Sequence, residues 1–309
     1  MTKLTTRASS INRALDQIGD KWCLLIIQEV FWGISTFGEM KAATGVSKGV
    51  LSDRLKWLVS IDCLHKEQAT ASTRRPGYYL TEKSAELYAS AMMAVTWERK
   101  YFSTPALDAV TLVHQRCGQA FKPQMHCGSC DEAIKVWDVS YKPGPGARQD
   151  ERDKKVRRRS SISLEHVPSQ RSLYKNLINI VGDRWTSNLI SLSFHGLKRF
   201  DEINKELPVA TNILADRLKF LVNEGIFEPK PYQERPVRYE YHLSDKGKDL
   251  FPWFLTLLQW GDKWCDSDGN GKPMKLTHTK CNKGLVGLVQ CSECGETLDP
   301  REVSFDFGD

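Results

Sequence analysis

The stretch TFGEMKAATGVSKGVLSDRLKWL, residues 36–58, contains two short helical patterns separated by a tight turn. The first runs over residues 37–43, and residues 44–46 (TGV) form the turn, where glycine breaks the helical pattern. The second begins at Ser47, a good N-cap residue, and continues to about Val59 with an apolar stripe on one face. Two such helices, the second carrying exposed basic and polar residues, predict a helix-turn-helix.

The same pattern recurs later in the chain. Residues 199–221 read RFDEINKELPVATNILADRLKFL, and the motif GDKW at 19–22 returns as GDRW at 182–185. Each matched pair is separated by 163 positions. A constant offset over most of a unit indicates that one fold occurs twice, so we expect a tandem repeat.

Further elements flank each helix-turn-helix. Apolar residues at helical spacing precede it, and residues 24–30 predict a buried helix. Residues 63–80 and 226–243 predict two-stranded hairpins with basic tips, which would form wings, and a last helix follows Thr81 or Ser244. The expected fold class is therefore mainly α with small β wings (α+β), as two winged helix-turn-helix domains.

A cysteine motif follows each predicted winged helix. Two sets of ligands have identical internal spacing, His-x2-Cys-x9-Cys-x2-Cys: His114, Cys117, Cys127 and Cys130 in the first copy, and His278, Cys281, Cys291 and Cys294 in the second. Three thiolates and one imidazole fill the four positions of tetrahedral Zn²⁺ and leave no open position for a catalytic water. We therefore expect each copy to hold one structural zinc ion in a zinc-ribbon-like module, two per chain.

Alternatives to this zinc set remain open on the residues alone. The cysteines could be free thiols or disulfides, and His126 is a competing fourth ligand in the first copy, although Gln290 occupies its place in the second. Cys23, Cys63 and Cys265 lack a cysteine partner in the other copy, so we expect buried or incidental thiols there.

These features predict five segments. They are a winged helix-turn-helix at 9–102, a zinc-ribbon-like module at 103–140, a flexible basic linker at 141–170, a second winged helix-turn-helix at 171–265 and a second zinc-ribbon-like module at 266–309. The linker prediction rests on PGPG at 143–146 and on the basic run from Lys154 to Arg159. That run is either a solvated linker or a tether that contacts phosphate.

Composition narrows the function class. The net charge is +6, and 40% of the 309 residues are hydrophobic, which is ordinary for a globular protein. No apolar run approaches the ~20 residues that cross a bilayer, and the N-terminal stretch lacks a signal-peptide core, so we expect a cytoplasmic protein with no membrane partner. No nucleotide-binding or hydrolase motif is present, which predicts that the chain is not an enzyme.

Three stretches, INRALDQIGDKWCLLIIQEV, TFGEMKAATGVSKGVLSDRLKWL and GYYLTEKSAEL, together with their second-copy counterparts, resemble the HxlR-type winged-helix transcriptional regulators of bacteria. The resemblance covers about residues 9–102 and 172–265. It implies a domain that dimerises through its terminal helices and binds near promoters. Because this chain carries two such domains, it could form a homodimer or serve as an intramolecular pseudo-dimer.

The expected DNA contacts follow from the fold. Side chains near the N-terminus of a recognition helix read base edges in the major groove, and basic wings contact phosphate or the minor groove. The candidates are Ser47, Lys48, Ser52, Arg54, Lys56, Arg74 and Arg75 in the first copy, and Thr211, Asn212, Arg217, Lys219, Arg235 and Arg238 in the second. The pairs Asp53-Arg54 and Asp216-Arg217 could instead form salt bridges within the helix.

The copies differ where sequence would be read, at Lys48-Gly49 and Thr211-Asn212. We therefore predict a regulator that binds double-stranded promoter DNA through two unlike half-sites. Two alternatives use the same fold: a protein-interaction adaptor, and a small-molecule or stress sensor with an aromatic pocket. The aromatic residues considered for that pocket are Trp97, Tyr101, Trp253, Trp260 and Trp264, which could equally form core or a dimer interface.

Overall fold

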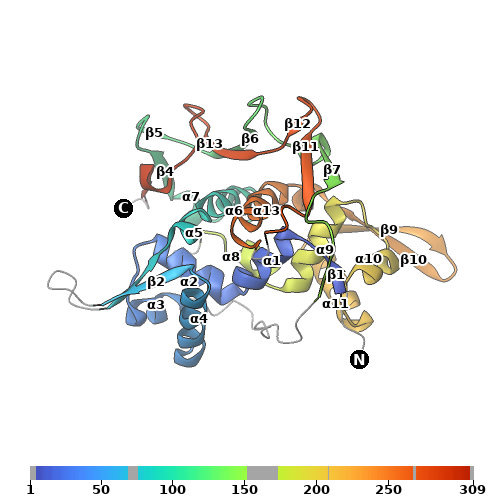
Figure 1. The fold of residues 1–309 in the computed structure, drawn as a ribbon, viewed down its shortest axis with the longest axis horizontal. Helices are drawn as coiled ribbons and strands as arrows, with labels where there is room; N and C mark the ends of the chain where they lie inside the picture. The colour runs from blue at the N-terminus through green and yellow to red at the C-terminus, as the bar shows by residue number, and fades with distance from the viewer. Residues whose placement is uncertain (1–4, 69–75, 152–172, 208, 267–268, 307–309) are drawn as a thin grey trace. The chain divides into compact units, whose positions relative to one another are not determined.

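The computed structural model describes residues 5–68, 76–151, 173–207, 209–266 and 269–306 (Figure 1). The chain divides into two compact units, and each unit combines segments of both repeats. The first-repeat unit comprises residues 17–124, 159–182 and 289–309, and the second-repeat unit comprises residues 1–16, 125–158 and 183–288. The compact units thus exchange segments between the two sequence repeats.

The first-repeat unit contains a winged helix-turn-helix. Its helices are α2 (Lys21–Phe31), α3 (Phe37–Thr44) and α4 (Lys48–Ser60), and its wing pairs β2 (Leu64–Glu67) with β3 (Gly77–Leu80) in antiparallel register. Thr36 and Glu39 form a capping box at the start of α3, and Gly45 ends that helix at φ 65°. The expected helix-turn-helix and its turn are confirmed.

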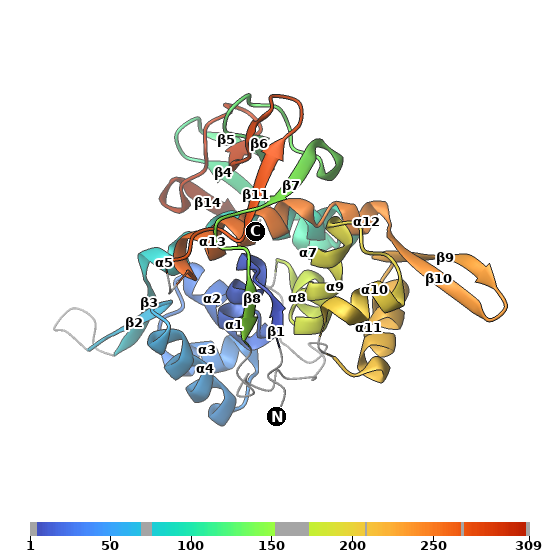
Figure 2. The ribbon, with the colours of Figure 1, turned by 45° about the vertical axis from the view of Figure 1, so that its right-hand side comes forward.

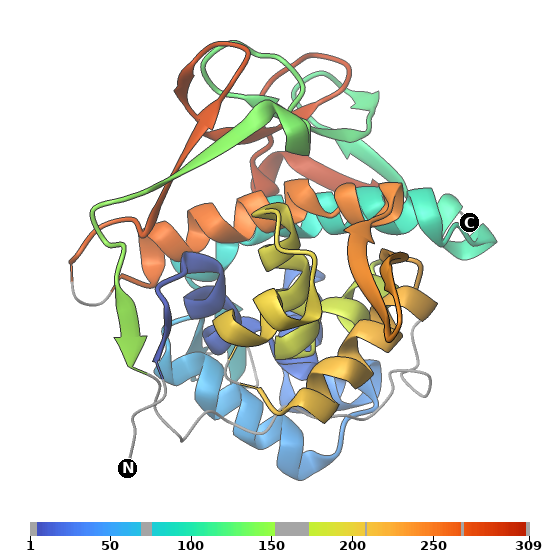
Figure 3. The same ribbon diagram turned by 90° about the vertical axis from the view of Figure 1, so that its right-hand side faces the viewer.

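The second-repeat unit contains the matching elements. They are α9 (Arg184–Phe194), α10 (Phe200–Glu206), α11 (Thr211–Asn223), and a hairpin of β9 (Phe227–Glu234) with β10 (Val237–Leu243). Figure 3 shows this hairpin in orange beside the gold helices of the same unit. The predicted class, helical with small β wings, is confirmed in both repeats.

The last helix of each repeat is divided, whereas the sequence predicted one continuous helix. A short turn of helix, α5 (Glu82–Ala85) or α12 (Asp245–Lys248), precedes α6 (Tyr88–Tyr101) or α13 (Phe251–Trp264). In the second repeat Pro252 stands in the first turn of α13. Proline lacks the N–H that a continuing helix would need, so a helix begins there rather than passing through.

The helix at the start of each repeat lies mainly in the compact unit that is named after the other repeat. Helix α8 (Lys175–Val181), which opens the second repeat, packs on α2 and α6 of the first-repeat unit. The Glu98 carboxylate accepts hydrogen bonds from the backbone N–H groups of Asn176 and Leu177, both at 2.9 Å. In the second-repeat unit, the Ser10 hydroxyl at the start of α1 (Ser10–Ile18) donates to Asp262 at 2.6 Å.

Small sheets carry the cysteine motifs. In the first-repeat unit, β4 (Thr111–His114) lies between β5 (Gln119–Ala120) and β14 (Val303–Asp306), after the short helix α7 (Pro105–Asp108). In the second-repeat unit, β11 (Met274–His278) lies between β12 (Lys283–Gly284) and β7 (Val139–Pro143), and Figure 2 shows β7 beside β11. Strands β6 (Pro123–Cys127) and β13 (Gly287–Cys291), with 3-10 turns η1 (Val136–Asp138) and η2 (Pro300–Glu302), complete these modules.

The first part of the predicted linker at 141–170 forms strands. Most of β7 and all of β8 (Gln149–Glu151), which pairs with β1 (Thr5–Arg7), fall within it because backbone partners are available there. The basic run from Lys154 to Arg159 lies outside the described residues. In the described part of the chain, every helix is too short or too polar to cross a bilayer.

Candidate metal centres and nucleic-acid interface

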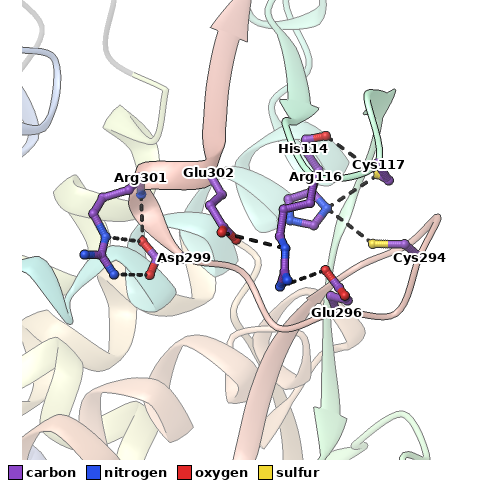
Figure 4. Close-up of polar contacts among 8 residues, drawn as sticks. All are labelled: His114, Arg116, Cys117, Cys294, Glu296, Asp299, Arg301 and Glu302. Atoms are coloured by element: carbon purple, nitrogen blue, oxygen red, sulfur yellow. Dashed lines mark hydrogen bonds and ion pairs between the residues drawn. The ribbon is translucent and has the colours of Figure 1, made fainter.

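The first cluster of metal-ligating side chains lies in the first-repeat unit. His114, Cys117, Cys291 and Cys294 place their ligand atoms within 4.8 Å of one another. The Cys294 Sγ lies 3.3 Å and the Cys117 Sγ 3.5 Å from His114 Nδ1, as the dashed lines of Figure 4 mark. The Sγ atoms of Cys117 and Cys291 are 4.0 Å apart.

The second cluster repeats this geometry in the second-repeat unit. Cys127, Cys130, His278 and Cys281 also lie within 4.8 Å of one another. His278 Nδ1 is 3.3 Å from Cys130 Sγ and 3.5 Å from Cys281 Sγ. The Sγ atoms of Cys127 and Cys281 are 4.0 Å apart, so the two clusters agree contact by contact.

This grouping corrects the expectation of one complete site per copy. Each cluster takes its His-x2-Cys pair from one repeat and its Cys-x2-Cys pair from the other. The reason is the course of the chain between the pairs. Strand β6 is extended over five residues up to Cys127, and at ~3.3 Å per residue it spans far more than the separation of two ligands. His126 is in neither cluster, and its Nδ1 lies 3.6 Å from Asp131.

The ligand pairs stand in four similar turns. Each turn places a left-handed residue four positions after its first ligand: Gly118, Asp131, Asn282 and Gly295, with φ between 54° and 73°. The backbone N–H of this residue donates to the carbonyl of the first ligand in all four turns, at 2.8–3.0 Å. Glycine, asparagine and aspartate are the residues that adopt this conformation at least cost, so the local sequence favours the turns.

The geometry fits a tetrahedral zinc ion. Bonds of ~2.3 Å to sulfur and ~2.1 Å to nitrogen place tetrahedral ligands ~3.6–3.8 Å apart, close to the separations in both clusters. Both imidazoles are fully buried. Burial alone would raise the pKa of the Cys127 thiol, but hydrogen bonds from the Ser129 and Cys130 backbone lower it. A backbone hydrogen bond from Glu132 alone would lower the pKa of the Cys130 thiol, but burial and hydrogen bonds with Cys281 and Cys127 raise it above its ordinary value.

Ion pairs join the two repeats beside each cluster, and sequence reasoning missed them. Arg116 lies 3.0 Å from Glu296 and 3.7 Å from Glu302 (Figure 4). Lys280 is the equivalent residue in the second copy, where the offset of the cysteine motif is 164 rather than 163, and it lies 3.5 Å from Glu132 and 3.6 Å from Asp138. The basic residue inside each His-x2-Cys pair therefore contacts acidic residues from the other repeat.

The recognition helices expose the first-turn residues that were predicted to read DNA. Ser47 and Lys48 are exposed at the start of α4, and Thr211 and Asn212 are exposed at the start of α11. Lys56 and Lys219 are also exposed, whereas Ser52 is half-buried. Ser47 caps α4 by accepting a hydrogen bond from Val50 N–H, whereas Ala210 at the start of α11 offers no such oxygen.

Arg54 and Arg217, which were predicted as DNA contacts, both form ion pairs within their own domain. Arg54 is 8% exposed, and its Nε and Nη2 donate to the two carboxylate oxygens of Asp20 at 2.8 and 3.0 Å. Arg217 pairs similarly with Asp183 at 3.0 Å. The acidic partner therefore lies in the GDxW motif, not beside the arginine in its own helix.

The GDxW and DRL motifs thus form one structural unit. The Asp20 carboxylate also accepts hydrogen bonds from Trp22 and Cys23 N–H, which caps α2, and Asp183 caps α9 in the same way. One carboxylate therefore begins the buried helix and holds the recognition helix against it. This double use explains why both motifs occur in both repeats.

The described part of the wings carries exposed basic residues. Arg235 and Arg238 are exposed at the tip of the β9–β10 hairpin, while Arg74 and Arg75 lie outside the described residues. Arg199, which sequence reasoning missed, donates from its Nε to Glu240 at 2.9 Å and lies 4.4 Å from the centre of the Tyr232 ring. Its contacts connect the start of α10 with the second wing.

The remaining cysteines and aromatic residues are structural. Cys23, Cys63 and Cys265 are buried, as predicted, and burial raises the pKa of Cys63 to about 12. Trp97, Trp253 and Trp260 are each no more than 4% exposed, and Tyr101 packs 5.5 Å from Trp97. Their burial favours the core interpretation over the aromatic pocket proposed from the sequence.

Comparison with known proteins matches both repeats to one family. The model of the HxlR-like helix-turn-helix matches residues 17–105 and 180–269, together more than half of the chain. An uncharacterised HTH-type transcriptional regulator of Mycobacterium bovis is 35% identical over 127 residues, 41% of this chain and 80% of that protein. The HTH-type transcriptional regulator YodB of Bacillus subtilis is 33% identical over 30% of this chain and 83% of its own length. The solved structure of reduced YodB covers 30% of this chain and 92% of that chain, with a TM-score of 0.28.

Proposed function

The chain belongs to the HxlR-like helix-turn-helix family, and from that premise we propose a DNA-binding transcriptional regulator that reads two unlike half-sites of promoter DNA. The observation that carries the proposal is the contrast between the exposed first turns, Ser47-Lys48-Gly49 in α4 and Ala210-Thr211-Asn212 in α11. Asn212 could pair bidentately with adenine, whereas Lys48 suits guanine or phosphate.

A binding-site selection tests whether the first turns of α4 and α11 recognise different DNA sequences. The wild-type chain should enrich two different half-sites at a fixed spacing. The triple variant Ser47→Ala, Lys48→Thr, Gly49→Asn gives α4 the first turn of α11 and should move the selected sequence toward two equal half-sites. The reverse exchange, Ala210→Ser, Thr211→Lys, Asn212→Gly, is the matched control. A perfect palindrome selected by the wild-type chain would refute the proposal.

The basic residues should act differently from the readers. Replacing Lys56, Lys219, Arg235 or Arg238 should weaken binding to all sequences alike. The slope of the logarithm of the binding constant against the logarithm of the salt concentration should fall by about one for each phosphate that is no longer bound. A titration against specific and nonspecific duplex at several salt concentrations separates the two classes. Reduced specificity without any change in salt slope would assign these side chains to base reading instead.

The metal proposal is two structural zinc ions per chain, one in each four-residue cluster. The support is the donor set of three sulfurs and one imidazole nitrogen, whose separations match a tetrahedron, and the matching geometry of the two clusters. A zinc ion in such a set has no open position, so its role would be to hold the two repeats together. His114, Cys117, Cys291 and Cys294 would hold one ion, and Cys127, Cys130, His278 and Cys281 the other.

Paired substitutions distinguish the exchanged sites from one site per repeat. In Cys117→Ser, Cys294→Ser both changes fall in one cluster, so one zinc per chain should remain. In Cys117→Ser, Cys130→Ser each cluster loses a ligand, so both ions should be released or bound more weakly. Sites confined to single repeats would give the opposite pattern. Metal content measured by atomic spectroscopy after dialysis decides, and near-zero zinc in the wild-type chain would refute the proposal.

We propose that one chain supplies both recognition helices of the complex with DNA. The support is the exchange of segments between repeats within each compact unit, which places α8 and the Cys-x2-Cys pairs among elements of the other repeat. The mass of the complex with a selected site should therefore correspond to one chain per duplex. Two chains per site would favour a homodimer.

Other functions receive less support. The relatives are named transcriptional regulators, which does not favour a protein-interaction adaptor and confirms the prediction that the chain is not an enzyme. A steep loss of affinity for nonspecific duplex as salt rises is expected of the DNA binder.

A further inference from the structure

The first-repeat unit contains a cavity that the DNA-reading function does not use. It has a volume of about 130 Å³ and lies among α2, α6, the start of α8 and the segment from Pro300 to Phe305. Its wall includes Gln28, Trp32, Tyr88 and Ala91. The lining is mostly apolar and aromatic, and no lining residue carries a formal charge.

Two polar atoms in this wall lack hydrogen-bond partners among the described residues. They are the Gln28 Oε1 and the Tyr88 hydroxyl. Gln28 is 2% and Tyr88 5% exposed, so bulk water does not satisfy them. Burial, with a smaller contribution from Asp299, raises the pKa of Tyr88, so its hydroxyl stays protonated and can donate. A buried polar atom without a partner costs stability, and a ligand in the cavity could supply the partner.

The second repeat offers an internal comparison. Seven of the lining residues, all from α2, its C-terminal end and α6, have counterparts 163 positions later, and these line a space of about 10 Å³ in the second-repeat unit. Phe254 stands where Ala91 stands in the first repeat, and Phe251 replaces Tyr88. Phe254 is 1% exposed, so its ring is packed fully inside its unit. The buried Tyr141 hydroxyl there also lacks a partner among the described residues, but the space is only large enough for a single water.

One copy of the duplicated core therefore contains a mostly apolar cavity with two polar atoms in its wall, and the equivalent space in the other copy is filled. We propose that the first-repeat cavity is a binding site for a neutral, single-ring aromatic compound with a hydroxyl group. An apolar cavity of ~150 Å³ accommodates benzene, so about 130 Å³ suits one ring. Neither atom is accessible to solvent, so both side chains would turn toward the cavity, where the ligand hydroxyl would donate to Gln28 Oε1 and accept from the Tyr88 hydroxyl. An ionised ligand would lose its hydration without a lining charge to replace it.

Calorimetry with phenol and toluene tests the site in the full, metal-loaded chain. The wild-type chain should bind phenol saturably, one per chain, and more tightly than toluene. Ala91→Phe should abolish phenol binding, because it introduces the residue that fills the equivalent space in the second repeat. Tyr88→Phe should weaken phenol roughly three- to tenfold, the value of one hydrogen bond, and leave toluene affinity unchanged.

Controls separate loss of the site from loss of the fold. The thermal midpoint and DNA affinity of Ala91→Phe should stay near wild type, and if this variant unfolds, the Tyr88→Phe comparison decides alone. Phe251→Tyr, the reverse change in the filled copy, should leave phenol affinity unchanged. No saturable phenol binding at millimolar concentration would overturn the proposal and leave the polar atoms to ordered water. Equal binding by wild type and a folded Ala91→Phe, or tighter binding of toluene than phenol, would also overturn it.

Discussion

Replacing Arg54 by methionine should lower the free energy of unfolding of the first-repeat unit rather than remove a contact with DNA. Methionine keeps an unbranched apolar stem in the buried space but removes both hydrogen bonds to Asp20. The Asp20 carboxylate, whose side chain is only 12% exposed, would then retain its cap contacts with α2 but lose its charged partner.

The magnitude follows from this geometry. Hydrogen bonds to charged groups contribute about 1.5–3 kcal/mol each, and removing one partner of a buried ion pair costs about 3–5 kcal/mol. Because the pair retains some solvent contact, we expect a loss of about 3 kcal/mol in the free energy of unfolding. For a unit of this size that corresponds to a fall of about 6–12 °C in the melting temperature.

Arg217→Met is the matched control in the second repeat. Its side chain is 32% exposed and forms one contact of 3.0 Å with Asp183, so a loss of about 1 kcal/mol is expected. Scanning calorimetry measures both effects, and Lys56→Met provides an exposed residue of the same helix that should weaken DNA binding without changing stability. If Arg54→Met kept its melting temperature while losing DNA affinity, Arg54 would be a DNA contact and the structural reasoning would be refuted.

Three further predictions concern single residues. Burial, with a smaller contribution from Arg7, lowers the pKa of His195 from 6.5 to about 4, so the unfolded chain binds the proton more readily. Stability should therefore fall as pH drops below about 6.5, by about 3 kcal/mol near pH 4, and His195→Phe should flatten this part of a pH-denaturation series. Gly45→Ala should cost about 1–2 kcal/mol in chemical denaturation because Gly45 ends α3 at φ 65°, whereas Gly38→Ala in the helix itself should not destabilise the chain. Cys63, whose pKa is raised to about 12 by burial, should resist alkylation in the native chain and react only on unfolding, and rapid native labelling would show that its burial is incomplete.

Local patterns were sufficient to predict most elements. The start and end of α4, the turn at Gly45 and the wing hairpins follow from capping, helical periodicity and turn residues, all of which act over a few positions. The eight candidate metal ligands were also identified from spacing, because each pair lies within one tight turn. The divided last helix and the strands inside the predicted linker were missed, since they depend on packing and on distant backbone partners.

The sequence by itself determined that one fold is present twice, since a constant offset of 163 positions is visible without any structure. It did not determine which ligand pairs meet, because the two repeats offer chemically equal pairs and only the path of the chain selects between them. Tertiary structure likewise decided that Arg54 contacts Asp20, 34 positions away. It also decided that the first-repeat unit contains a cavity whose equivalent in the second-repeat unit is filled, because a cavity depends on side chains from distant segments. The repeat can thus be read from the sequence, whereas the exchange of segments between its copies can be seen only in the tertiary structure.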